Sequence, residues 1–267
     1  MTEFECCLRP IKADTVKFIR FLRVTEMINR RAFVFALGAC FLGPSVYASF
    51  PKKWTDEAAA SVKDFMPGLV SQPYLKELFN GTLLKARFNY YLEQNVFYLN
   101  AYARSLSLLA SRFPTEEEIR FFSYHSSVTI DLISYSKETY QKINQKEMPA
   151  LVKKDKTLLD YVNFEAAHCA FSELAVAASA MYPCFWVYQK IGEEYRKMKK
   201  AAENNLYSEW VAGYTDTSYD EQVKKFGGIL NRLAENSSPA TRKEMLRAFV
   251  AGCAYEKSFF EACYKAC

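Results

Sequence analysis

Apolar residues recur at steps of three and four along most of the chain, a spacing that places side chains on one face of an α-helix. The clearest run shares one face between residues 88 and 109: Phe88, Tyr91, Leu92, Asn95, Tyr98, Leu99, Tyr102, Leu106 and Leu109. We expect this helix to end by Pro114, because proline lacks the amide hydrogen that a helix needs. Strict apolar/polar alternation is rare, and glycine and proline number only nine each. The pattern therefore predicts an all-α protein.

Polar residues mark the expected starts of three further helices. Thr115 with Glu118 and Ser218 with Glu221 have the spacing of capping boxes, and Ser238 precedes Pro239. Residues 158–182 are rich in alanine and apolar nearly all round, which predicts one long central helix. No repeat or flexible linker interrupts the chain from Trp54 onward, so we expect a single helical domain over residues 49–267.

Residues 1–48 are set apart as an N-terminal extension, because residues 27–48 have the layout of a signal peptide. The basic pair Arg30 and Arg31 precedes an apolar run, and Val46 and Ala48 then supply a small-residue cleavage site. The apolar run is too short to span a membrane. Two interpretations stay open. The segment directs export, with translation starting at Met27, or it is an amphipathic helix of a cytoplasmic protein.

Composition narrows the classes of function. The net charge of +5 is modest, and the basic clusters are separated rather than interleaved with aromatic residues, so we expect no nucleic-acid partner. None of the eight cysteines forms a paired zinc-binding spacing, and only two histidines exist to assist them. The sequence therefore gives no reason to expect a metal or another cofactor.

Cys184 is the candidate nucleophile. Pro183 favours the first turn of a helix, which would place Cys184 where free backbone amides lower a thiol pKa and favour the thiolate. Tyr188 follows four residues later and shares its face. The alternative is that Cys184 is a small core residue, as most cysteines are.

Glu256 is the candidate acid. It lies beside Tyr255, Phe259 and Phe260, and burial among aromatic residues would raise the pKa of its carboxyl group and make it a proton donor. The alternative is a glutamate at the edge of its helix that reaches water.

Asn95 and Tyr98 stand three residues apart, so both can face one cavity. The Asn95 amide offers a donor and an acceptor together, which matches the edge of an aminopyrimidine. Tyr161 and Tyr214 are candidates to close such a pocket by stacking. The alternatives are a helix-to-helix hydrogen bond for Asn95 and ordinary packing for the tyrosines.

The body of the chain resembles the TenA family, also called thiaminase II, from about Pro73 to Tyr264. Any one matching segment is weak evidence, but five in the right order are specific: 88–95, 183–193, 207–214, 233–236 and 255–256. The resemblance implies a heme-oxygenase-like helical fold, a homotetramer and a cytoplasmic location. It also implies a small-molecule pyrimidine or thiamin as the binding partner.

The resemblance also implies a reaction, the hydrolysis of an aminomethyl-pyrimidine to a hydroxymethyl-pyrimidine and ammonia; many members cleave thiamin as well. Cys184 falls on the family's nucleophile and Glu256 on its acid/base. The pocket tyrosines of the family correspond to Tyr98, Tyr161, Tyr188 and Tyr214.

This chain departs from the family pattern in three places. Asn95 stands where a substrate-holding aspartate is usual, so we expect weakened or altered specificity. Phe260 replaces a common tryptophan, which is a smaller change in packing. The signal-like segment is unusual for an enzyme of this kind.

Two other classes of function are compatible with the sequence. One is a di-iron oxidase of the same fold, because Glu165 and His168 have Glu-x-x-His spacing. That site needs a second such motif, whereas Phe122 stands three residues before His125, the other histidine. The other class is an exported protein that captures pyrimidines without turning them over.

Overall fold

The computed structural model describes residues 53–151, 153–197 and 204–266, so the extension 1–48 and its signal-like segment lie outside the described residues. Every regular element in the described ranges is helical, which confirms the all-α prediction. The long helices are α4 (Lys85–Ala110), α5 (Glu116–Asn144), α6 (Lys156–Phe171), α7 (Leu174–Lys197), α9 (Thr217–Glu235) and α10 (Pro239–Lys265). The short elements are α1 (Trp54–Ser61), α2 (Met66–Val70), α3 (Pro73–Asn80), α8 (Ser208–Ala212) and the 3-10 turn η1 (Gly213–Thr215).

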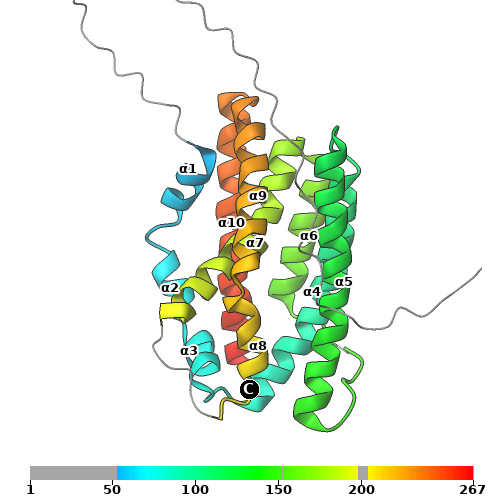
Figure 1. Cartoon of the computed structure of the whole chain (residues 1–267), viewed down its shortest axis with the longest axis vertical. Coiled ribbons are helices and arrows are strands. Elements are labelled where there is room, and N and C mark those ends of the chain that lie inside the picture. Colours follow the sequence, from blue (N-terminus) through cyan, green and yellow to red (C-terminus); the bar gives the residue numbers. More distant parts are fainter. Residues whose placement is uncertain (1–52, 152, 198–203, 267) are drawn as a thin grey trace, which may run out of the picture. The chain divides into compact units, whose positions relative to one another are not determined.

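The long helices run alongside one another, with α1, α2 and α3 along one side (Figure 1). Helix α4 packs against α5 and α6, and α7 packs against α6, α9 and α10. Helix α7 thus contacts most of the other long helices, which places its residues at the centre of the bundle. None of the helices in the described ranges is long and apolar enough to cross a membrane.

The predicted apolar face of α4 is confirmed, because all nine positions from Phe88 to Leu109 are buried. Thr115 caps α5 through the amide of Glu118, and Ser238 caps α10 through the amide of Thr241, as expected. The third predicted cap is wrong. Helix α9 begins two residues earlier than a cap at Ser218 would allow, and the Asp216 carboxylate accepts a hydrogen bond from the Ser218 amide at 2.8 Å.

The prediction of one helix over residues 158–182 is also wrong, because the chain breaks at Ser172 between α6 and α7. The Arg112 guanidinium group donates to the carbonyl oxygens of Cys169 and Ser172 at 2.7 and 2.5 Å. These bonds satisfy carbonyl groups that the next helical turn would otherwise use. The apolar pattern of residues 158–182 could not indicate this break, because Arg112 lies far away in the sequence.

Pro183 does not begin a helix but lies inside α7, which corrects the expected placement of Cys184 in a first turn. The Pro183 ring packs against α10 at Gly252, where an added Cβ would lie 2.4 Å from the ring Cγ. Glycine at this position of α10 leaves room for the Pro183 ring between the two helices. Cys184 therefore has no free amides of a helix N-terminus beside it.

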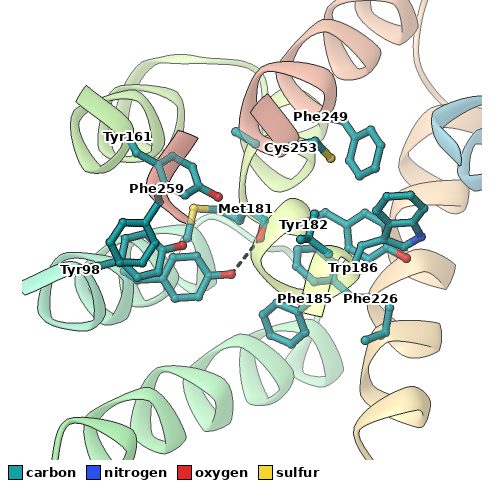
Figure 2. Packing of buried hydrophobic residues seen from close by; sticks show 14 of the residues in the cluster. Tyr98, Tyr161, Met181, Tyr182, Phe185, Trp186, Phe226, Phe249, Cys253 and Phe259 are labelled. Carbon is teal, nitrogen blue, oxygen red and sulfur yellow. Dashed lines mark hydrogen bonds between the residues drawn. The ribbon is translucent and has the colours of Figure 1, made fainter. Parts of the chain in front are cut away.

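Aromatic side chains fill much of the space between the helices. The Tyr98 and Tyr161 rings lie side by side at one end of the cluster in Figure 2, while Tyr182, Phe226 and Phe249 group at the other end. Cys169, Cys184, Cys253 and Cys263 are free thiols. The core thus continues directly into the tyrosines that were predicted as site residues.

Candidate active site

A cavity of about 280 Å³ opens between α4, α5, α7 and the α8–α9 segment. Its lining is mostly aromatic and comprises Tyr91, Asn95, Tyr98, Leu99, Val128, Leu132, Tyr135, Cys184, Tyr188, Trp210, Gly213, Tyr214 and Tyr219. Five of the seven residues predicted for the site therefore line one cavity. The other two, Tyr161 and Glu256, are buried and do not line it.

Tyr161 and Glu256 are nevertheless joined to the cavity through Tyr98. The Tyr161 ring stacks on the Tyr98 ring with centroids 5.3 Å apart. The Tyr161 hydroxyl group donates to Glu256 Oε1 at 3.0 Å. One layer of side chains thus connects the wall of the cavity to the buried carboxyl group.

The Cys184 thiol is partly buried at the cavity wall, and its pKa is raised rather than lowered. Burial is the main cause, and the nearby carboxyl groups of Glu256 and Glu165 act in the same direction. The hydroxyl groups of Tyr98 and Tyr102 oppose the shift by hydrogen bonding to the thiol. The sequence-based expectation of a lowered pKa is therefore wrong, because it depended on Pro183 starting a helix.

Glu256 is buried as predicted, with 1% of its surface exposed. Burial raises the pKa of its carboxyl group to about 8, and the hydrogen bond from Tyr161 opposes that shift. Near neutral pH the group is therefore mostly protonated, so it can donate a proton.

A second buried carboxyl group, Glu165, was not predicted as a site residue. Tyr98 donates to Glu165 Oε1 at 3.0 Å, and Glu165 Oε2 has no hydrogen-bond partner within the described residues. Burial and the neighbouring Glu256 raise the pKa of the Glu165 carboxyl group well above its ordinary value. A sequence signal did exist, since Glu165 follows Tyr161 by one helical turn and so shares its face.

The same contacts bear on the di-iron alternative. His168 does not join Glu165, because its Nδ1 pairs with the Ser172 hydroxyl group at 2.8 Å. No group of three or more histidine, cysteine, aspartate or glutamate side chains suited to a metal ion occurs in the part of the chain that the structure describes.

Three tyrosine hydroxyl groups, contributed by α4, α7 and η1, lie close together in another part of the cavity wall. Tyr91 lies 3.4 Å from Tyr188 and 3.5 Å from Tyr214, measured between hydroxyl oxygens. Trp210 Nε1 donates to the Tyr214 hydroxyl group at 2.9 Å. Tyr214 also lies close to α7, because a Cβ added to Gly192 would be 2.0 Å from the Tyr214 carbonyl oxygen. Burial raises the pKa of Tyr214 to about 12, so its phenol stays neutral.

Comparison with known proteins identifies the family. Residues 60–266 match the model of the TENA/THI-4/PQQC family, which is most of the chain. The chain belongs to this family. The sequence-based prediction of a TenA relative is thereby confirmed.

Two solved structures resemble this TenA-family chain in fold. A TenA homologue from P. horikoshii OT3 superposes with a TM-score of 0.73 at 18% identity, covering 81% of this chain and all of that one. A heme-oxygenase-like domain from Shewanella denitrificans superposes with a TM-score of 0.63 at 11% identity, covering 79% of this chain and 91% of that one. The predicted heme-oxygenase-like fold is confirmed.

A related protein from Bacillus subtilis (strain 168) is named aminopyrimidine aminohydrolase. It is 24% identical to this TenA-family chain over 226 residues, which span 80% of this chain and 90% of that protein. The match therefore extends over nearly the whole of the relative. The family match over residues 60–266 includes every residue that lines the cavity.

Proposed function

We propose that this chain is an aminopyrimidine aminohydrolase, which replaces the amino group of an aminomethyl-pyrimidine with a hydroxyl group and releases ammonia. The observation that carries the proposal is the shared cavity: the Cys184 thiol and the Asn95 amide face one aromatic space. Glu256, mostly protonated, connects to the same space through Tyr161 and Tyr98. The name of the Bacillus subtilis relative supports the same activity.

In the proposed reaction Cys184 is the nucleophile and Glu256 is the general acid. The substrate ring stacks between tyrosines, and its amino edge meets Asn95. The Cys184 thiol gives its proton to the amino group of the substrate and its sulfur adds to the ring, while Glu256, one layer of side chains behind the cavity wall, supplies a proton to a ring nitrogen. Ammonia leaves with the electron pair of its bond to the exocyclic carbon. Water adds to that carbon and returns a proton to Glu256. The ring then expels the Cys184 thiolate, which takes up the proton of the ring nitrogen. Tyr98, Tyr188 and Tyr214 line the space around the ring, and Tyr161 positions Glu256 through its hydrogen bond.

The test compares two substrates, because both aminomethyl-pyrimidine and thiamin contain a pyrimidine ring that the proposal places against the same cavity wall. The purified chain is incubated separately with aminomethyl-pyrimidine and with thiamin, and hydroxymethyl-pyrimidine is followed by mass spectrometry. Cys184→Ala should lower product formation by at least about a thousandfold. Cys169→Ala is the matched control, because Cys169 is a buried free thiol outside the cavity. Equal rates for the wild type and Cys184→Ala would rule out the nucleophile.

A binding protein without turnover is the second candidate, favoured by the Asn95 amide in the cavity. It predicts that both pyrimidines bind and that neither releases ammonia. The same incubation, with ammonia measured beside bound ligand, separates the two candidates.

Two further expectations need separate experiments: the homotetramer, and export directed by residues 27–48, which lie outside the described residues. The tetramer is tested by light scattering of the purified chain. Export by residues 27–48 is tested by the N-terminal sequence of the mature protein, which should begin near Ser49 if cleavage occurs.

A further inference from the structure

The Asn95 side chain stands out because nothing holds it. It lines the cavity with 6% of its surface exposed, and it makes no hydrogen bond to any residue that the structure describes. Its neighbour Gln94 shows the opposite behaviour: its Nε2 donates to the Lys153 carbonyl and its Oε1 accepts the Asp155 amide, both at 2.9 Å. Buried amides normally have partners, so an open amide facing a cavity points to a ligand.

The missing partners leave the orientation of the Asn95 amide undetermined by the protein. An amide has an acceptor on one side and a donor on the other, and a half-turn exchanges them. Gln94 could not turn without losing two hydrogen bonds. Asn95 turns at no such cost, so it can present either order of donor and acceptor to a ligand.

The two orientations match two kinds of pyrimidine edge. An aminopyrimidine presents an amino donor beside a ring-nitrogen acceptor. A pyrimidinone presents a carbonyl acceptor beside a ring N–H donor. Each edge forms two hydrogen bonds with one orientation of an amide. A carboxylate has acceptors only, so it forms two hydrogen bonds with an aminopyrimidine whose basic ring nitrogen has taken up a proton, and it opposes the carbonyl oxygen of the pyrimidinone.

We propose that Asn95 widens the ligand range of this cavity to pyrimidinones, which it binds by turning its amide over. The inference rests on the proposed function, because that function places a pyrimidine edge against Asn95. It adds a second class of ligand, in which an oxygen replaces the ring amino group.

Binding without turnover tests the proposal in the full chain carrying Cys184→Ala. Isothermal calorimetry compares hydroxymethyl-aminopyrimidine with the pyrimidinone that differs from it only at this edge. With Asn95 present, the two dissociation constants should agree within about tenfold. Adding Asn95→Asp should weaken binding of the pyrimidinone by about tenfold or more relative to the aminopyrimidine. The ring nitrogen of the aminopyrimidine can take up a proton and keep both hydrogen bonds, whereas the pyrimidinone loses one and its carbonyl oxygen faces a carboxylate oxygen.

Asn100→Asp is the matched control, since it makes the same chemical change on an exposed turn of α4 and should leave the ratio unchanged. If Asn95→Asp fails to fold, as judged by circular dichroism, Asn95→Ala replaces it and should weaken both ligands alike. Tight aminopyrimidine binding without pyrimidinone binding overturns this inference and leaves the proposed function standing. Binding of neither ligand contradicts both. An unchanged ratio in a folded Asn95→Asp variant also overturns the inference.

Discussion

Replacing Glu256 by glutamine should make the stability of the protein less dependent on pH. Burial raises the pKa of the Glu256 carboxyl group from 4.5 to about 8, so the folded state holds this proton more tightly than the unfolded chain does. The contribution of the protonated Glu256 carboxyl group to the free energy of unfolding is fully present below pH 4.5 and is lost as the pH rises through about 8.

The size of the loss follows from that interval. Each pH unit between the two values costs about 1.4 kcal/mol, so the wild type should lose at most about 5 kcal/mol. The loss is a maximum because an ionised carboxylate can recruit water. Glutamine has the same shape, can accept the Tyr161 hydrogen bond through its oxygen, and does not titrate.

Equilibrium unfolding in urea at a pH near 5 and a pH near 8 measures the effect. The free energy of unfolding should fall more steeply with pH in the wild type than in Glu256→Gln. Some dependence should remain in the variant, because Glu165 is buried nearby. Glu138→Gln, on the exposed surface of α5, should behave like the wild type. Equal slopes for the wild type and Glu256→Gln would refute the reasoning.

Two further predictions concern the walls of the cavity. Gly192→Ala should destabilise the protein by about 1–3 kcal/mol and weaken pyrimidine binding, because the new Cβ would lie 2.0 Å from the Tyr214 carbonyl oxygen and force Tyr214 to move. Gly228→Ala, with open space around it in α9, should be neutral or stabilising; urea unfolding compares the two. Glu165→Gln should lower the pH at which iodoacetamide alkylates Cys184 half-maximally, because one buried charge that raises the thiol pKa is removed. Peptide mass spectrometry follows the alkylation, and an unchanged or higher pH contradicts the prediction.

The parts of the fold that the sequence revealed are those set by local pattern. The face of α4 repeats at helical spacing, and the caps Thr115 and Ser238 act on amides three residues away. The failures involve distant partners. Arg112 binds the carbonyl groups at the break after α6, and the Pro183 ring inside α7 packs against α10 where Gly252 leaves room for it.

The candidate site shows the same division. The segments that resemble the family contain Asn95, Cys184, Tyr188 and Tyr214, which the structure brings to one cavity, but they do not indicate the protonation of the groups around it. The pKa of the Cys184 thiol is raised first by burial and then by Glu256 and Glu165, which come from two other helices. Glu165 was missed as a site residue because its contact with Tyr98 exists only once α4 and α6 have packed.

The position of Trp210 gives this protein a built-in optical reporter. Of the three tryptophans, Trp210 alone lines the cavity, where its indole stacks on Tyr135 and donates to Tyr214. Trp54 and Trp186 are also buried, but they do not line the cavity. A flat ligand ring that enters the cavity therefore changes the surroundings of Trp210 but not those of the other two tryptophans. Intrinsic fluorescence should therefore follow ligand entry in real time, without any label, and Trp210→Phe should silence the signal.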